Sequence, residues 1–141
     1  NIKLDKINFY NPVEKMTSQS ILFNEVSLGS ISESIYAHKS VSIVDSEIDN
    51  VSSFMETPIL HIRNSNIGCL AEVIKVSYMK IENTHIGQKP NIQFMDKKRF
   101  IINNCPDIQN WLPSILEENP DVSIIIDGMT LSKKKKQELI L

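Results

Sequence analysis

The chain has 141 residues, of which 41 % are hydrophobic and 23 % are charged. This composition is typical of one folded domain with a sizeable core, and it excludes an intrinsically disordered chain. A formal net charge of −2 gives no electrostatic reason to expect binding to nucleic acid or to an anionic membrane. No apolar run approaches the roughly 20 residues that a membrane-spanning helix needs. The sequence has no initiator Met and no recognisable signal peptide, so we expect it to be a fragment of a larger protein.

The first 20 residues are predicted to form an N-terminal strand or cap. Apolar and polar residues alternate there as in a half-buried strand, with a break at Asp5-Lys6. The alternating apolar residues are Ile2, Leu4, Ile7 and Phe9. Asn11-Pro12 predicts a turn, because proline pushes the preceding residue out of helical backbone space. The polar segment at residues 13–20 is predicted to be a loop.

One short pattern recurs five times between residues 21 and 108. Each copy has an apolar residue, a second one two places later, and a third after a short polar interval. The copies begin at Ile21, Val41, Leu60, Met79 and Phe100, in steps of 20, 19, 19 and 21 residues. A near-constant period of this size is typical of solenoids, in which one coil cannot bury its own core and neighbouring coils stabilise one another.

Two polar columns lie inside this repeat. The first holds Glu25, Asp45, Asn64, Asn83 and Asn104. Asn and Asp tolerate left-handed backbone better than other non-glycine residues, so this column predicts a tight bend between two short strands. The next column holds Val26, Ser46, Ser65, Thr84 and Cys105. These residues should point inward and stack, with their polar atoms satisfied by neighbouring turns.

The remaining segments have a less regular pattern. Residues 32–40, 52–59, 71–78 and 88–99 carry scattered apolar residues without helical periodicity, and we expect them to supply the other side of each coil. Beyond Cys105 the spacing becomes helical, with apolar residues at Ile108, Trp111, Leu112, Ile115 and Leu116. Asn110 is the predicted N-cap of this helix. A buried strand at residues 122–126, a turn at Asp127-Gly128, a resumed strand at residues 129–131 and a helix after Ser132 follow.

Two solenoid architectures fit the repeat. Residues 62–67 (IRNSNI) and 81–86 (IENTHI) resemble the I-x-N-[ST]-x-I units of pectate-lyase-like right-handed β-helices, which carry Asn at the bend between two sheets. The spacing also resembles the leucine-rich repeat, although the signature Asn column of that family here holds Val, Ser, Ser, Thr and Cys. We predict a mainly β fold, a parallel β-helix of about five coils spanning residues 21–108, with a leucine-rich-repeat solenoid as the alternative. Residues 109–141 would form a cap of helix and strand over the open edge of the last coil.

Few residues carry recognisable chemistry. His38, His61 and His85 fall in different columns of the repeat, so we expect no histidine cluster for a metal or for catalysis, and we predict no cofactor. Cys69 and Cys105 also occupy different columns, which argues against a disulfide and favours a small buried thiol at Cys105. The basic runs at residues 97–99 and 133–136 have no interleaved aromatic residues, and they are interpreted as a solvated loop and a solvated helix.

One cluster suggests an enzyme. Asp45, Glu47 and Asp49 are acidic, and Arg63 and Lys80 follow on later coils. β-Helix lyases and hydrolases set carboxylates and basic residues on adjacent coils for acid–base chemistry on sugars. The resemblance to that family therefore implies, as an alternative function, a polysaccharide lyase or a glycoside hydrolase.

The preferred hypothesis is a non-catalytic module that binds a protein, or else a glycan, through the outward faces of its coils. The predicted binding residues are Ser42, His61, Arg63, Lys80, Glu82 and Asn103, and Asp45, Asn64, Asn83 and Asn104 form the predicted structural ladder of turns. No nucleic-acid partner is expected. The high content of Ile, Asn and Lys is typical of A/T-rich genomes. Together with the abrupt ends, it motivates the hypothesis that the module is the recognition segment of a secreted bacterial effector, a virulence factor delivered into a host cell.

Overall fold

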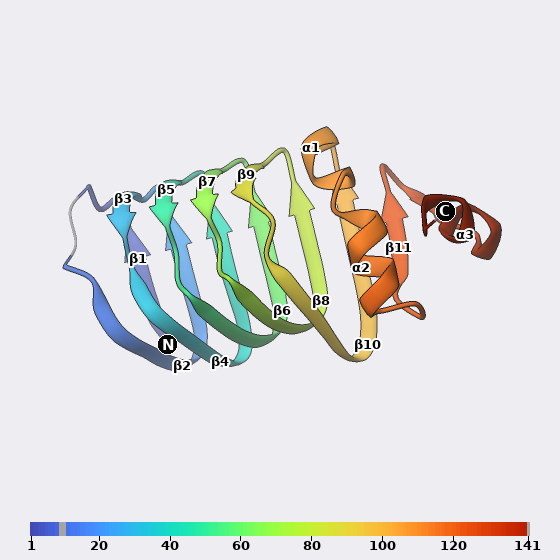
Figure 1. The fold of residues 1–141 in the computed structure, drawn as a ribbon. Coiled ribbons are helices and arrows are strands. Elements are labelled where there is room, and N and C mark those ends of the chain that lie inside the picture. The colour runs from blue at the N-terminus through green and yellow to red at the C-terminus, as the bar shows by residue number, and fades with distance from the viewer. Residues whose placement is uncertain (9–10, 141) are drawn as a thin grey trace.

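The computed structural model describes residues 1–8 and 11–140, so Phe9 of the predicted N-terminal strand lies outside the described part, as do Tyr10 and Leu141. The fold is mainly β, with 61 % strand and 14 % helix, and its coils stack in parallel over about five turns (Figure 1). This confirms the predicted fold class, a solenoid of stacked coils with short helices and strands at the C-terminal end.

The described residues form two sheets. The first sheet (sheet A) contains, in spatial order, β1 (Ile2–Asp5), β2 (Val13–Asn24), β4 (Ser32–Val44), β6 (Phe54–Arg63), β8 (Val73–Glu82), β10 (Asn91–Asn103), β11 (Ser123–Ile126) and β12 (Met129–Thr130). The second (sheet B) contains β3 (Ser27–Ser30), β5 (Glu47–Asn50), β7 (Asn66–Cys69) and β9 (His85–Gln88). All pairs are parallel except the pair of β11 with β12.

Each coil consists of one long and one short strand. The long strand bends midway, so its first half lies in the front layer of Figure 1 with sheet B, and its second half forms the rear layer. A tight bend then returns the chain to the short strand of the front layer. The four less regular segments of the sequence form the first halves of the long strands, which confirms that they supply the other side of each coil.

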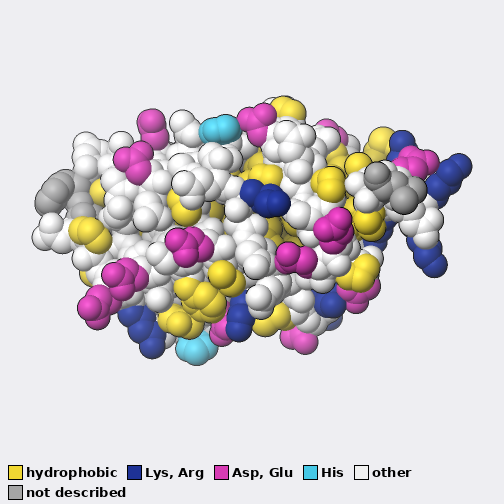
Figure 2. All heavy atoms as spheres, viewed as in Figure 1, with side chains coloured by type: hydrophobic (Ala, Val, Ile, Leu, Met, Phe, Trp, Pro, Cys, Tyr) yellow, Lys and Arg dark blue, Asp and Glu magenta, His cyan; other side chains and the backbone are white. Residues whose placement is uncertain are grey.

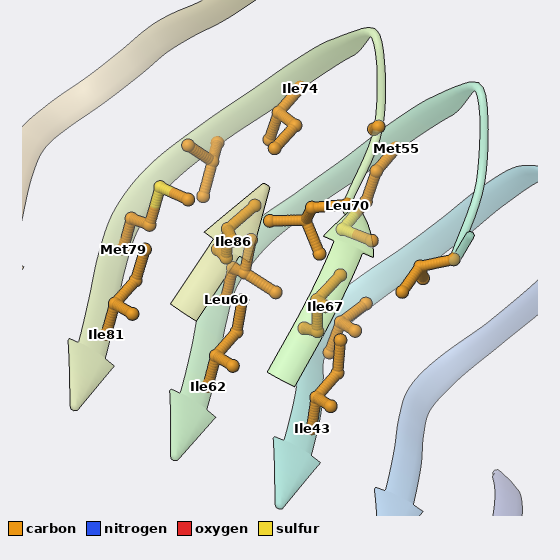
Figure 3. Close-up of a cluster of buried hydrophobic side chains, with 14 of the residues drawn as sticks. Ile43, Met55, Leu60, Ile62, Ile67, Leu70, Ile74, Met79, Ile81 and Ile86 are labelled. Carbon is orange, nitrogen blue, oxygen red and sulfur yellow. The ribbon is translucent and has the colours of Figure 1, made fainter. Parts of the chain in front are cut away.

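The core lies between the two layers and is built from rows of like residues. Val41, Leu60 and Met79 stand beside one another on neighbouring strands, and all three are fully buried. Ile67 and Leu70 belong to the same cluster of buried side chains, part of which is drawn in Figure 3, and are also fully buried. Fully burying a side chain of this size contributes about 1.5–3 kcal/mol. Because each row continues into the next coil, that stabilisation is shared between neighbours.

The tight bends have the left-handed geometry that the sequence predicts. Asp45, Asn64, Asn83 and Asn104 have φ values of 51°, 52°, 46° and 54°. Asn64 joins β6 of sheet A to β7 of sheet B, the position expected of a bend between two sheets. The same column continues ahead of the predicted repeats, because Lys6 (φ 56°) also adopts this conformation one coil before Glu25. Asp127 (φ 49°) and Gly128 (φ 83°) instead form the two-residue turn between the antiparallel strands β11 and β12. The register of the coils thus begins at β1, where Ile2 lies beside Ile21, and continues to β11.

Amide side chains link these bends on the outside. Asn64 Nδ2 donates to Asp45 Oδ1 at 3.2 Å, Asn83 Nδ2 donates to Asn64 Oδ1 at 3.2 Å, and Asn104 Nδ2 donates to Asn83 Oδ1 at 2.7 Å. Asn and Asp are therefore favoured at these bends for two reasons. They tolerate the left-handed backbone, and their side chains bond to the bend of the neighbouring coil.

A second ladder lies inside the bends. The backbone N–H of Ser46 donates to Ser65 Oγ at 3.1 Å, and that of Ser65 donates to Thr84 Oγ1 at 3.3 Å. The Ser65 hydroxyl donates in turn to the Arg63 carbonyl at 2.9 Å. The Thr84 N–H donates to Cys105 Sγ at 3.4 Å. These buried polar atoms are satisfied by neighbouring turns, as the sequence predicts.

The prediction of a loop at residues 13–20 is wrong, because this segment is the first half of β2. Most of its side chains are polar, because Met16 is the only one of these residues that is buried. The strand forms because its backbone pairs with β4. Pairing with a neighbouring coil outweighs the weak local signal.

The C-terminal helix prediction is corrected in detail. Residues 106–118 form two short helices, α1 (Pro106–Gln109) and α2 (Leu112–Glu118), and Asn110 is the C-cap of α1, with Trp111 as the N-cap of α2. All five residues of the predicted apolar stripe are nevertheless buried. The strand at β11, the turn and the helix α3 (Lys133–Ile140) are present, and the Lys135 N–H donates to Ser132 Oγ at 3.2 Å.

Candidate binding surface

The six predicted binding residues lie on one side of sheet A, on the second halves of the long strands. Ser42, His61 and Lys80 are neighbours on β4, β6 and β8, and Arg63, Glu82 and Asn103 are neighbours on β6, β8 and β10. We call this surface, together with Ile59, Tyr78, Arg99 and Ile101 of the same strands, the outer face. Paired strands are about 4.8 Å apart, so these side chains form a closely spaced array.

Three of these residues are brought into direct proximity. Lys80 Nζ is 2.8 Å from Glu82 Oε1, and His61 Nε2 is 4.0 Å from the same oxygen. The Lys80 and Glu82 side chains are 31 % and 21 % exposed, so water screens this ion pair only in part. His61 Nε2 is buried and has no hydrogen-bond partner, because 4.0 Å exceeds hydrogen-bonding distance.

The electrostatics of this group favour fixed charges. The hydrogen bond from Lys80 holds the pKa of Glu82 below its ordinary value, and the same bond raises the pKa of Lys80. Burial lowers the pKa of His61, and the positive charges of Lys80 and Arg63 act in the same direction, whereas Glu82 opposes them. At neutral pH the group therefore presents an ammonium, a carboxylate and a neutral imidazole.

Sequence reasoning missed a cavity at the margin of the outer face. It has a volume of about 820 Å³ and lies where the long strands bend. Pro58, Ile59 and Tyr78 line it together with Asp96 and the basic run at residues 97–99, for which the sequence predicts a solvated loop. A signal for it was available, because the step from Met79 to Phe100 is longer than the 19-residue steps before it and so marks inserted residues.

The acidic cluster of the enzyme hypothesis is not assembled with its basic partners. Asp45 lies at a bend, and Glu47 and Asp49 are exposed on β5 in sheet B, whereas Arg63 and Lys80 belong to the outer face of sheet A. Neither Arg63 nor Lys80 forms an ion pair with any of the three acids in the described part of the chain. Asp45 and Glu47 instead border a shallow groove of about 710 Å³ that runs along the bends.

The histidines and cysteines occupy separate places. His38 is exposed, and His85 Nδ1 is 2.9 Å from Asp107 Oδ2, far along the chain from the His61 group. Both cysteines are free, and Cys105 is buried, as predicted. Within residues 1–8 and 11–140, no group of three or more His, Cys, Asp or Glu side chains is arranged to hold a metal ion. Among the same residues, no helix has the length and apolar character required to cross a membrane.

The opposite side of the molecule carries an aromatic cluster that sequence reasoning also missed. Figure 2 shows this side, on which hydrophobic side chains gather between groups of Lys or Arg. The ring centroids of Tyr36 and Phe54 are 5.5 Å apart. Lys15 Nζ lies 4.9 Å from the Tyr36 ring and Lys75 Nζ lies 5.9 Å from the Phe54 ring, so both rings already have cations beside them.

Comparison with protein-family models, with curated proteins and with solved structures found no match to this chain. The structure establishes the architecture of the chain as a parallel β-solenoid of about five turns.

Proposed function

We propose that this chain is a non-catalytic interaction module that binds a partner through its outer face, with a protein as the preferred partner and a glycan as the second choice. The observation that carries the proposal is the in-register array of Ser42, His61, Arg63, Lys80 and Glu82 on three adjacent strands. Side chains on paired strands have fixed spacing, and pre-organised groups lose little conformational freedom when they bind.

The charge states of the outer face support binding rather than catalysis. A general acid works best when its pKa lies near the working pH, but the pKa of Glu82 is lowered by Lys80. A lysine acts as a base when its pKa is lowered, whereas that of Lys80 is raised. These groups are suited to present permanent charges to a partner. Arg63 adds an exposed guanidinium that forms no ion pair among the described residues.

The carbohydrate-active enzyme remains the alternative. It is supported by the resemblance of residues 62–67 and 81–86 to pectate-lyase-like units, and by the groove that Asp45 and Glu47 border. The hypothesis that the module belongs to a larger secreted bacterial effector is likewise a proposal, and its support is compositional.

The test uses a random peptide library and a glycan array, screened with the unmodified chain, with Arg63→Glu and with Lys134→Glu. Both substitutions reverse one exposed positive charge, but Lys134 lies on α3. Ligands of the outer face should bind the chain and Lys134→Glu equally, and should bind Arg63→Glu at least about tenfold more weakly, a loss of about 1.4 kcal/mol. Ligands that bind all three proteins equally would show that the array around Arg63 is not the binding surface.

The enzyme alternative is tested by incubating the chain with a panel of polysaccharides and measuring new reducing or unsaturated ends. Turnover that disappears in Asp45→Asn and Asp49→Asn would establish catalysis and overturn the non-catalytic module.

A further inference from the structure

The cavity at the margin of the outer face is formed by an insertion in β10. Phe94 pairs with Val76, but the next paired residue, Arg99, stands beside Tyr78. β10 thus has four residues, Met95 to Lys98, where β8 has only Ser77. Asp96 adopts a left-handed conformation with φ 48°, which lets the extra residues turn away from the sheet. The insertion forms one wall of the cavity.

The floor of the cavity is apolar and comes from two adjacent strands. Ile59 of β6 and Tyr78 of β8 are register neighbours, and Arg99 of β10 stands beside Tyr78 on the other side. Ile59 is 44 % exposed, although it belongs to a residue type that is usually buried. Pro58 extends this apolar floor. A volume of about 820 Å³ is within the range of about 300–1,000 Å³ that is usual for ligand-binding pockets.

The rim of the cavity is positively charged. Lys97, Lys98 and Arg99 line it, against the single carboxylate of Asp96. Lys98 Nζ is 3.0 Å from Asp121 Oδ1 and is therefore neutralised locally. Lys97 and Arg99 form no ion pair within residues 1–8 and 11–140, so two cations remain available beside an exposed apolar floor.

We propose that this cavity binds an acidic peptide segment of a partner protein, with one apolar side chain in the cavity and flanking carboxylates on Lys97 and Arg99. The inference rests on the proposed function and names the partner chemistry. Charge complementarity favours an acidic ligand, and a recessed apolar floor favours one inserted side chain. A glycan would need many hydrogen-bonding partners for its hydroxyl groups, whereas the neutral hydroxyls that line the cavity are those of Ser77, Tyr78 and Ser123. A flat membrane surface would not fill a recess.

The experiment measures fluorescence anisotropy of labelled peptides of about 12 residues, in which glutamates flank one central residue that is Leu, Phe or Ser. The Leu or Phe peptide should bind the full chain. Binding should weaken at least about tenfold with the Ser peptide, with Gln in place of the glutamates, and when salt rises from roughly 50 to 300 mM.

Three variants locate the binding site. Binding should fall by at least about tenfold in the double variant Lys97→Glu/Arg99→Glu and in Ile59→Ser. The double variant Lys133→Glu/Lys134→Glu, which reverses as many exposed charges on α3, should bind like the unmodified chain. Circular dichroism checks that each variant is folded. Ile59 and the two cations are exposed or half-exposed, so their replacement should leave the core intact.

Two outcomes would overturn the inference. One is binding of the acidic peptides that survives both cavity substitutions. The other is the absence of peptide binding by the unmodified chain, whether or not vesicles with about 30 % phosphatidylserine or an acidic oligosaccharide bind instead. If these peptides fail but the library or the array yields ligands that depend on Arg63, the inference about the cavity is wrong and the proposed function stands. If no ligand depends on either surface, both are wrong.

Discussion

The side chain of Asn119 takes the place of a missing strand beside Phe94. Asn119 Oδ1 accepts the Phe94 N–H at 3.1 Å, and Asn119 Nδ2 donates to the Ile92 carbonyl at 3.1 Å. The next strand, β11, pairs with β10 only from Arg99 onward, so the earlier half of β10 would otherwise have unpaired backbone groups on this side. Asn119 is 5 % exposed, and one buried carboxamide thus completes the edge of the last long strand.

Replacing Asn119 by Leu should destabilise the chain by about 2–4 kcal/mol, because it leaves a buried N–H and a buried C=O without partners. The matched control is Asn110→Leu, since Asn110 is exposed at the end of α1. That control should stay within about 0.5 kcal/mol of the unmodified chain. Urea denaturation followed by circular dichroism measures both, and equal unfolding midpoints would contradict the role of Asn119.

Asn64→Ala should cost about 1–3 kcal/mol, because alanine tolerates the left-handed backbone poorly and cannot bond to Asp45 or Asn83. Asn64→Gly keeps the backbone freedom and loses only the side-chain ladder. It should therefore be the more stable of the two variants. A glycine variant as unstable as the alanine variant would assign the effect to the ladder rather than to the backbone.

The inner ladder predicts a contrast at Ser65. Ser65→Ala removes the acceptor of the buried Ser46 N–H and should lower the free energy of unfolding by about 1–3 kcal/mol. Ser65→Thr keeps the hydroxyl, and Thr84 already occupies the equivalent position one coil later. The threonine variant should unfold close to the unmodified chain. Thermal denaturation of both variants tests whether the hydroxyl or only the small volume matters.

Close packing of the short strands predicts a difference between two glycines. A Cβ atom at Gly68 would lie 2.5 Å from the Asp49 carbonyl oxygen, whereas one at Gly29 would meet nothing within 4 Å. Gly68→Ala should destabilise by about 1–3 kcal/mol, since β5 and β7 must move apart. Gly29→Ala should be neutral or stabilise by up to about 1 kcal/mol. Comparable melting temperatures for the two variants would contradict this prediction, because they would mean that β5 and β7 can move apart at little cost.

Acid should weaken the fold in two stages. The pKa of His61 is below its ordinary 6.5 in the folded chain, so below pH 6.5 the unfolded chain binds a proton more readily and stability falls. The pKa of Glu82 is below 4.5 in the folded chain for a different reason, the hydrogen bond from Lys80. The stability that ionised Glu82 contributes is therefore present above pH 4.5, and it is lost as the pH falls through the pKa of Glu82 in the folded chain. His61→Gln should reduce the loss of stability just below pH 6.5, and Glu82→Gln should reduce the loss below pH 4.5.

Denaturation midpoints measured from pH 7.5 down to about pH 3 separate these stages. A pH profile of His61→Gln that parallels that of the unmodified chain between pH 6.5 and pH 5 would show that His61 is not the group that titrates there.

The sequence predicts much of the fold because the signals repeat. Five copies of one pattern place Asn64 and its equivalents at left-handed bends and Ser65 and its equivalents inside them, and both ladders are present. The residues outside the pattern were harder to interpret. Lys6 has the same left-handed geometry as Asn64, but lysine is not a residue type that favours it. The sequence pattern therefore does not indicate that the first coil begins before residue 21.

The candidate surface was predicted only in part. Alternation along each strand identifies which side chains face outward, and the six predicted residues do share a face. The cavity depends instead on register, because Arg99 reaches Tyr78 only after three extra residues have been looped out of β10. A basic run such as residues 97–99 gives no local sign of which apolar residues of other coils will lie beneath it. That information exists only once the strands are paired.

The two edges of each coil differ in how they accept added length. At the edge with the left-handed bends, cross-coil hydrogen bonds hold the turns at Asp45, Asn64, Asn83 and Asn104 to the same geometry. At the opposite edge the strands pair with shifts in register, near Lys39 in β4 and across Met95 to Lys98 in β10, and the core rows continue undisturbed on either side. This edge is therefore a natural grafting position. A foreign loop inserted between Pro58 and Ile59, or at Ser77, should be displayed beside the cavity while the stack of coils keeps its pitch.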